Sequence, residues 1–219
     1  MSKGRLVAFE GGEASGKSTQ AATFAERLGA VLTREPGGTA LGRRIRDLVL
    51  DPGAVGLDAR AEALLLAADR AQHVREVVAP ALAAGRDVVS DRFSASTLAY
   101  QGHGRGLPTE DLAWLSAWAS DGLEPDLVVL LEVDGAVATA RQGMADLDRL
   151  EAAGAGFHER VREGYRALAV ADPERWVVVD GNGSVSEVAA RVWAAYEAWA
   201  RSSATASEIA AGRITDGHR

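Results

Sequence analysis

The chain has 219 residues, almost half of them apolar, which is enough to bury the core of one compact domain. It contains no cysteine, so disulfides, thiolate metal sites and cysteine nucleophiles are excluded, and a reducing compartment, the cytoplasm, is expected. The 31 acidic residues outnumber the 24 basic ones, which argues against a nucleic-acid-binding surface, and no stretch is long and apolar enough to span a membrane.

Five short β-type runs alternate with longer helical patterns along the chain. The expected strands are residues 5–10, 30–33, 87–91, 127–133 and 176–180. The last two runs are apolar without polar alternation, as in strands that helices cover on both faces. The pattern therefore predicts an α/β fold, a three-layer sandwich in which helices flank a five-stranded parallel sheet.

Helical spacing or composition connects these strands. The expected helices are residues 17–28, 40–50, 58–84, 109–121 and 137–141. Gly85 and Gly122 stand where helices commonly stop, and Pro80 is able to kink the long third helix.

The last helix is the best-marked element of the chain. Ser184 and Glu187 form a capping-box pattern, and apolar residues then recur on one face as far as Trp199. The polar residues 202–219 lack such a stripe, so we expect a loosely ordered tail there. The predicted organisation is one domain over residues 1–201 followed by this tail.

A glycine-rich segment follows the first strand and opens the first helix. Its residues are Gly11, Gly12, Glu13, Ala14, Ser15, Gly16, Lys17, Ser18 and Thr19. Glycine, four residues, then glycine, lysine and serine is the pattern of a phosphate-binding loop. In such a loop backbone N–H groups point at the donor phosphates, Lys17 adds a cation, and the Ser18 hydroxyl can ligate Mg²⁺. The loop predicts nucleotide binding, but it does not by itself distinguish a kinase from a GTPase or an ATPase motor.

Two residues near the loop carry charges of opposite sign beside each other. Asp91 ends the third strand, where neighbouring parallel strands present their C-terminal ends to one crevice, and is the natural second Mg²⁺ group. Arg92 is suited to hold an acceptor phosphate in a fork, although a surface salt bridge is the alternative. Glu13 is negatively charged, so a role toward the acceptor makes more sense for it than contact with the donor phosphates. The alternative is a loop carboxylate that simply faces solvent.

Four further segments occur with the phosphate loop in a fixed order. They are Thr33-Arg34-Glu35-Pro36-Gly37-Gly38-Thr39, Ala68-Asp69-Arg70, Asp91-Arg92 with Ser96-Thr97 and Tyr100-Gln101-Gly102, and Asp148-Arg149-Leu150-Glu151. Their order and spacing make the chain closely resemble bacterial thymidylate kinases, P-loop nucleoside monophosphate kinases, over most of residues 5–200. The resemblance implies that ATP and dTMP are the substrates, that dTDP and ADP are formed for dTTP biosynthesis, and that Mg²⁺ is the cofactor.

The resemblance also assigns acceptor residues. It implies that Arg70 hydrogen-bonds a thymine carbonyl, that Thr97 meets the base ring nitrogen and that Tyr100 packs under the sugar. Thymine presents carbonyl acceptors and one N–H, so an arginine donor and a hydroxyl acceptor suit it. Ordinary helix packing is the alternative for Thr97 and Tyr100.

Three other positions belong to the implied dTMP site. Arg46 resembles an arginine that joins Arg92 on the acceptor phosphate, but it could also be a solvated helix charge; Gln101 follows Tyr100 in the same segment. Leu66 stands where the family usually has an aromatic residue that stacks on thymine, so its contact is apolar without ring stacking.

A lid is expected over residues 142–156. Bacterial relatives commonly carry several arginines there, whereas this chain has Met144 near one such site. Because the phosphate loop has no arginine, a lid arginine must stabilise the charge that develops during transfer. We assign Arg149 as catalytic beside Lys17 and Arg92, with Arg141 as the weaker candidate.

Other functions stay open at this point. Another nucleoside monophosphate kinase has the same architecture, and a nucleotide-binding regulatory ATPase shares the loop, although no Asn-Lys-x-Asp segment for guanine occurs. Trp114 and Trp118 share a helix face, which fits either a homodimer, as the family generally forms, or burial within the monomer. ATP and dTMP are the expected partners, without nucleic acid or membrane.

Overall fold

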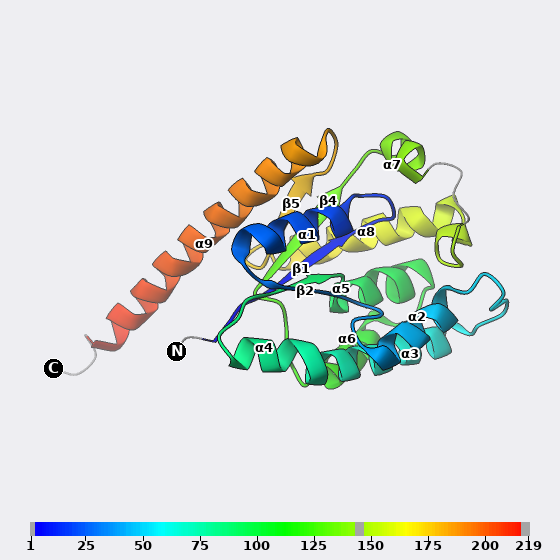
Figure 1. The fold of residues 1–219 in the computed structure, drawn as a ribbon, viewed down its shortest axis with the longest axis horizontal. Helices are drawn as coiled ribbons and strands as arrows, with labels where there is room; N and C mark the ends of the chain where they lie inside the picture. The colour runs from blue at the N-terminus through cyan, green and yellow to red at the C-terminus, as the bar shows by residue number, and fades with distance from the viewer. Residues whose placement is uncertain (1–2, 143–146, 216–219) are drawn as a thin grey trace.

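The computed structural model describes residues 3–142 and 147–215, and five strands in this part form one parallel sheet (Figure 1). They are β1 (Leu6–Gly11), β2 (Val31–Arg34), β3 (Val88–Asp91), β4 (Leu127–Glu132) and β5 (Trp176–Asp180). The order is β2-β3-β1-β4-β5, so each parallel neighbour is reached by a crossover. The predicted α/β sandwich is confirmed, and each strand begins and ends within one residue of its prediction.

Helices cover both faces of the sheet. They are α1 (Lys17–Leu28), α2 (Ala40–Leu50), α3 (Ala59–His73), α4 (Ala79–Ala83), α5 (Ser94–Thr97), α6 (Thr109–Ala119), α7 (Gly135–Gln142), α8 (Ala155–Ala171) and α9 (Val185–Thr215). No helix in the described part of the chain is both long and apolar enough to cross a membrane.

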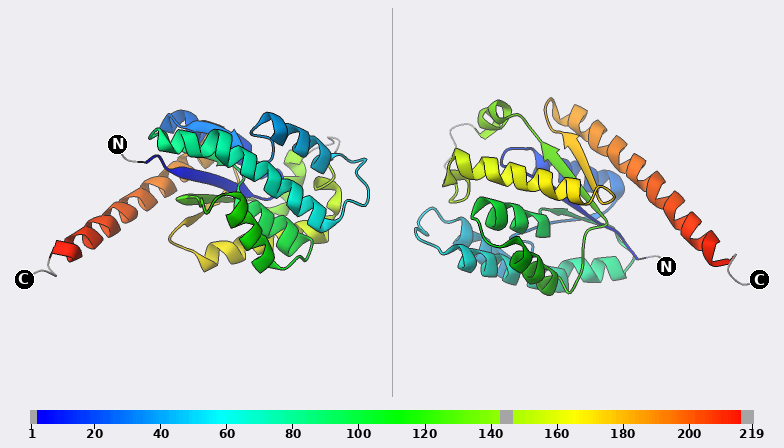
Figure 2. Two further views of the ribbon diagram at one scale, coloured as in Figure 1. Left: turned by 90° about the horizontal axis from the view of Figure 1, so that it is seen from below. Right: turned by 180° about the vertical axis from the view of Figure 1, so that it is seen from behind.

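The core explains why apolar residues on successive positions of a strand point to both faces of the sheet. Val7 and Phe9 of β1 point to one face, where they pack with α1 and α9, and Leu6 and Ala8 point to the other, where they pack against the segment around α4. Figure 2 shows α1 and α9 on one side of the sheet and α3, α4, α6 and α8 on the other. The central strands β1, β3 and β4 are therefore buried on both faces, whereas in the edge strands Leu32 of β2 and Val178 of β5 stay exposed, so the cover predicted for the last run is incomplete.

The long helix predicted for residues 58–84 is interrupted. It consists of α3, one π-helical turn (Val74–Val78) and α4, and in the π turn the Ala79 N–H donates to the Val74 carbonyl five residues back. Pro80 has no N–H for the carbonyl four residues before it, so the distortion falls in the turn that precedes the proline.

Two helical segments were not predicted from the sequence. One is α5, which continues as a π-helical segment (Leu98–Gly104). The other is α8, which buries Phe157, Val161 and Tyr165. Their spacing of four residues is a helical period, so the sequence did contain the signal for α8.

The last helix is longer than predicted. Helix α9 does not end near Arg201 but continues to Thr215, through most of the segment expected to be a loosely ordered tail, and projects beyond the sheet (Figure 1). Alanine is frequent between residues 204 and 211, and its high helix propensity favours the helix without an apolar stripe. The domain boundary at residue 201 stays a prediction, and residues 216–219 lie outside the described part.

Candidate active site

The phosphate loop bends tightly between β1 and α1. Gly11 and Gly16 have φ angles of 149° and 88°, and a Cβ atom on Gly11 would lie 2.6 Å from the Leu131 carbonyl oxygen. Lys17 is buried and its Nζ donates to the Gly12 carbonyl at 3.1 Å. Burial, together with the nearby charge of Arg92, lowers the pKa of Lys17. The loop therefore holds its lysine in place next to the N-terminus of α1.

Ser18 and Asp91 lie side by side, as the sequence predicts. The Ser18 hydroxyl donates to Asp91 Oδ2 at 2.6 Å, and the second carboxylate oxygen, Oδ1, is buried without a hydrogen-bond partner. Pairing of Phe9 with Asp91 in the sheet brings the end of β3 to the loop. A hydroxyl and a carboxylate with an unused oxygen fit Mg²⁺, which takes one or two carboxylates and completes its shell with phosphates and water.

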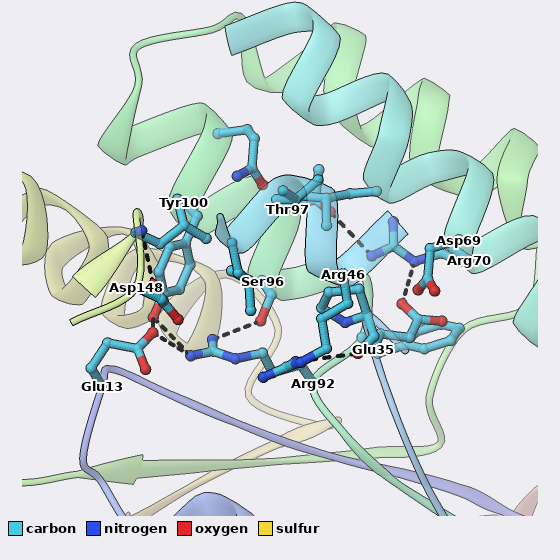
Figure 3. A pocket seen from close by; sticks show the side chains of 17 residues that line it. Glu13, Glu35, Arg46, Asp69, Arg70, Arg92, Ser96, Thr97, Tyr100 and Asp148 are labelled. Carbon is cyan, nitrogen blue, oxygen red and sulfur yellow. Dashed lines mark hydrogen bonds and ion pairs between the residues drawn. The ribbon is translucent and has the colours of Figure 1, made fainter. Parts of the chain in front are cut away.

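Arg92 is the centre of the polar network in this crevice (Figure 3). Its backbone has a φ of 72°, which turns the side chain from the end of β3 back across the phosphate loop. Nη2 donates to Glu13 Oε1 at 2.6 Å and to the Tyr100 hydroxyl at 2.9 Å, and Nη1 donates to Ser96 Oγ at 3.2 Å. One guanidinium thus connects the loop with the helical segment that follows β3.

The charges in this network reinforce each other. Although burial alone would raise the pKa of Glu13, the charges of Arg92 and Lys17 lower it to about 2. Burial opposes the charge of Arg92, but Tyr100 and Glu13 around it raise its pKa well above the usual value. Glu13 therefore faces Arg92 and Tyr100, not open solvent, which supports an acceptor-side role.

Sequence reasoning missed two members of the network, Glu10 and Tyr165. Glu10 is fully buried and accepts hydrogen bonds from Ser96 Oγ at 2.6 Å, Phe93 N at 2.8 Å and the Tyr165 hydroxyl at 2.9 Å. Burial raises the pKa of Glu10. A charged residue at the end of an otherwise apolar strand was the available signal for Glu10, whereas Tyr165 required the fold of α8.

A cavity of about 80 Å³ opens beside this network. All eight residues predicted to bind dTMP line it: Glu13, Arg46, Leu66, Arg70, Arg92, Thr97, Tyr100 and Gln101. These residues come from the phosphate loop, α2, α3 and the helical segment after β3. We call this cavity the acceptor pocket.

Arg70 is fully enclosed at the wall of the acceptor pocket (Figure 3). Its Nε donates to Glu35 Oε2 at 2.8 Å, and Nη2 donates to Thr97 Oγ1 at 3.1 Å. Nη1 donates to Ser116 Oγ on α6 at 3.2 Å. The predicted pair of base-contacting residues, Arg70 and Thr97, is thus in direct contact.

Arg46 is half-buried in the same pocket. Its Nη1 donates to the Pro36 carbonyl at 3.2 Å. Burial, with the charges of Arg34 and Arg92 close by, lowers the pKa of Arg46. Arg46 and Arg92 are close enough to repel each other, and an anion between them would relieve this repulsion. This favours a phosphate-binding role for Arg46 over that of a solvated helix charge.

The two arginines considered for the lid have different surroundings. Arg149 donates through Nη2 to Glu62 and through Nε to the Val49 carbonyl at 2.8 Å. Val49 lines the acceptor pocket, whereas Arg149 and Glu62 are not among its lining residues. Arg141 donates through Nη1 to the Ser15 carbonyl of the loop at 3.4 Å. The assignment of Arg149 as the catalytic lid arginine stays a prediction, and in this structure its guanidinium is bound to the buried carboxylate of Glu62.

Glu62 explains the position of Arg149. It is fully buried on α3 and accepts from Gln101 Nε2 at 2.6 Å and from Arg105 Nη2 at 3.2 Å, besides Arg149. A buried carboxylate needs cationic partners, and these two arginines supply them. Of the predicted lid, residues 143–146, which include Gly143 and Met144, lie outside the described residues.

Comparison with known proteins agrees with this geometry. The family model described as thymidylate kinase matches residues 9–192. The chain belongs to the thymidylate kinase family. It is 50% identical over 195 residues to the thymidylate kinase of Synechococcus sp. (strain JA-3-3Ab), covering 86% of this chain and 93% of that protein. It is 47% identical over 203 residues to the thymidylate kinase of Deinococcus radiodurans, covering 89% and 97%.

A solved thymidylate kinase has the same fold. The crystal structure of thymidylate kinase from Ehrlichia chaffeensis superposes with a TM-score of 0.73 at 31% identity and covers 87% of this chain and 97% of that one. The resemblance to thymidylate kinases that five short segments indicated is therefore confirmed over most of the chain.

Proposed function

We propose that this protein transfers the γ-phosphoryl group of ATP to dTMP and so forms dTDP and ADP. One observation carries the proposal: the acceptor pocket gathers all eight predicted dTMP residues, and Arg92 in it is bonded to Glu13 of the phosphate loop. Two nucleotide sites that share one arginine at their junction suit direct transfer between phosphates, with no covalent intermediate.

The donor side consists of the phosphate loop and Asp91. Backbone N–H groups of residues 11–19 and the Lys17 ammonium hold the ATP phosphates, while Ser18 and Asp91 hold Mg²⁺. When bound, the metal ion supplies positive charge to the phosphate oxygens and orients them. Transfer is then mainly a matter of position and charge, for which a rigid, buried lysine is suitable.

On the acceptor side, different residues bind the phosphate, the sugar and the base of dTMP. Arg92 and Arg46 neutralise the dTMP phosphate, and Tyr100, which lies next to Arg92, packs under the sugar. Arg70 and Thr97 meet the polar edge of thymine, and Leu66 provides apolar contact. Among the arginines near the lid, we propose Arg141 as the one that reaches the donor phosphates, since it already contacts the loop.

We further propose a homodimer formed through α6. Trp114 and Trp118 are 68% and 72% exposed, their rings stack with centroids 6.1 Å apart, and Leu64 on the adjoining α3 is also exposed. Large exposed aromatic residues on one face are typical of an interface. Light scattering of the wild type and of Trp114→Glu tests this: a dimer that becomes a monomer supports the interface, and an unchanged mass opposes it. The absence of cysteine fits the cytoplasm as the location.

A screen of acceptors tests the proposed function. Each nucleoside monophosphate, with ribose or deoxyribose, is supplied at equal concentration with Mg-ATP, and the diphosphate product is measured. A strong preference for dTMP supports the proposal. Preference for another monophosphate favours a different kinase of this class, and ATP hydrolysis that no acceptor accelerates favours a regulatory ATPase.

A further inference from the structure

A chain of buried hydrogen bonds leads from the edge strand β2 to Arg70. Glu35 accepts from Arg70 Nε through Oε2 at 2.8 Å and is bonded through Oε1 to His73 Nδ1 at 2.9 Å. His73 Nε2 lies 2.6 Å from Thr33 Oγ1. We call these residues, Thr33, His73, Glu35 and Arg70, the Arg70 relay. The last three are at most 4% exposed.

The hydrogen-bonding roles in the relay follow from chemistry. A carboxylate only accepts, so the proton on His73 Nδ1 points at Glu35, and the other ring nitrogen is left for the Thr33 hydroxyl. Glu35 thus has one oxygen fixed by the imidazole and the other by the guanidinium. Because Glu35 binds at Nε, it sets the plane in which the two terminal nitrogens of Arg70 lie.

Close packing holds the relay in this arrangement. A Cβ atom on Gly38 would lie 2.5 Å from His73 Cδ2, so the turn after β2 approaches the imidazole more closely than any other residue permits. Asp69 Oδ1 accepts from Gly37 N at 3.0 Å and fixes the same turn to α3. The carboxylate of Glu35 therefore cannot shift without moving the turn.

Arg70 retains donors for a ligand. Its guanidinium has five N–H groups, and Glu35, Ser116 and Thr97 accept three of them in the described part of the chain. The remaining two belong to the terminal nitrogens of a buried side chain that lines the acceptor pocket. A base carbonyl in the pocket can accept from them, whereas an exocyclic amino group would place donor against donor.

We propose that Glu35, fixed by His73 and Thr33, is a positioning residue that orients Arg70 and thereby makes the pocket select bases with a carbonyl, not an amino group, at this edge. The inference rests on the proposed function, because it requires a pyrimidine monophosphate in the acceptor pocket. It adds a cause of selectivity that begins outside the pocket: Glu35 lines the pocket, but Thr33 and His73, which fix it, are not among the lining residues.

The test measures the dissociation constants of dTMP and dCMP, which differ at C4 in a carbonyl and an amino group, by titration calorimetry. Thr33→Val removes the hydroxyl at constant shape, and Thr33→Ser keeps it. Glu35→Gln keeps an acceptor for Arg70 but loses the charge. Gln72→Ala is the control, because Gln72 lies on the same helix as Arg70 and its side chain donates to Glu76, outside the relay.

Thr33→Val and Glu35→Gln are expected to weaken dTMP binding about fivefold or more and to leave dCMP binding within about twofold, as expected for one misaligned hydrogen bond. Thr33→Ser and Gln72→Ala should behave like the wild type. If both variants bind dTMP and dCMP more weakly by the same factor, the relay has only a structural role and the inference fails. If the wild type itself does not prefer dTMP, the proposed function fails as well. Thr33→Val leaves the buried ion pair intact, so it remains informative even if Glu35→Gln unfolds the protein.

Discussion

Arg92 and Glu13 form an ion pair of 2.6 Å that joins the end of β3 to the phosphate loop. Ser96 and the Tyr165 hydroxyl accept from the other terminal nitrogen of Arg92, each at 3.2 Å. The protein itself therefore orients the guanidinium, and under the proposed function this cation needs little reorganisation to receive the acceptor phosphate.

The fork of Arg92 is predicted to be indispensable. Arg92→Lys keeps the charge but cannot reach Glu13, Ser96 and Tyr100 at once, so KM for dTMP should rise about tenfold or more, with a fall in kcat. Steady-state kinetics with varied dTMP measures both. Arg175→Lys, at a surface ion pair with Glu124, is the control and should match the wild type. Wild-type kinetics in Arg92→Lys would show that the planar fork is unnecessary.

Arg141 and Arg149 are predicted to affect different kinetic constants. Arg141→Ala removes the arginine beside the phosphate loop and should lower kcat about a hundredfold or more, as loss of a charge-stabilising arginine does. Arg149→Ala removes one of the two arginines that pair with buried Glu62, which binds Gln101 of the acceptor pocket, and should mainly raise KM for dTMP. Turnover at saturating substrate separates the two. A large loss of kcat in Arg149→Ala alone would contradict the role proposed for Arg141 and favour Arg149 as the catalytic arginine.

These arginines illustrate what the sequence could predict. The phosphate loop, Asp91 and Arg92 were identified because their order beside short apolar strands determines where they lie in a parallel sheet. The partner of Arg149 could not be predicted, since Glu62 looks like any helix carboxylate until tertiary packing buries it. A motif predicts where a residue lies in the fold. The partner of a long side chain depends on tertiary packing, which the motif does not contain.

Some helical elements could likewise be predicted from the sequence, and others could not. The strands and α1 were predicted closely because apolar runs and a glycine-rich loop mark them. Pro80 indicated a kink in the third helix, but not that it takes the form of a π turn at residues 74–78. The extension of α9 follows local alanine content, which apolar periodicity does not register.

Leu66 is predicted to limit affinity for the base. Leu66→Phe places a ring in the acceptor pocket, one helical turn from Arg70, and should lower KM for dTMP several-fold, because an aromatic contact adds about 1 kcal/mol. Leu48→Phe, at an exposed leucine of α2 that does not line the acceptor pocket, is the matched control and should leave KM unchanged. An unchanged or raised KM in Leu66→Phe would indicate that this position does not contact the base.

Asp69 is predicted to make stability depend on pH. Burial is the main cause that raises the pKa of Asp69 from 3.8 to about 6. The hydrogen bond from the Gly37 N–H lowers this pKa, and the charge of Glu35 raises it further. A carboxyl whose folded pKa is raised stabilises the fold below its unfolded pKa and loses this contribution as pH rises through the folded pKa. Between pH 5.5 and 7.5 the wild type should therefore lose about 1 kcal/mol of unfolding free energy relative to Asp69→Asn.

Urea titrations of wild type and Asp69→Asn at several pH values measure this difference. Comparison with the variant cancels the titration of other groups, provided that they do not contact Asp69. A constant difference across the range, or one that grows in favour of the wild type as pH rises, would contradict the raised pKa.

The central claim is that ATP and a deoxythymidine monophosphate are bound end to end across Arg92. ADP formation from Mg-ATP, measured with and without dTMP, tests it most directly. We predict rapid ADP formation that requires dTMP and yields an equal amount of dTDP. ADP formation at the same rate without dTMP, or no dTDP when dTMP is present, would contradict the claim.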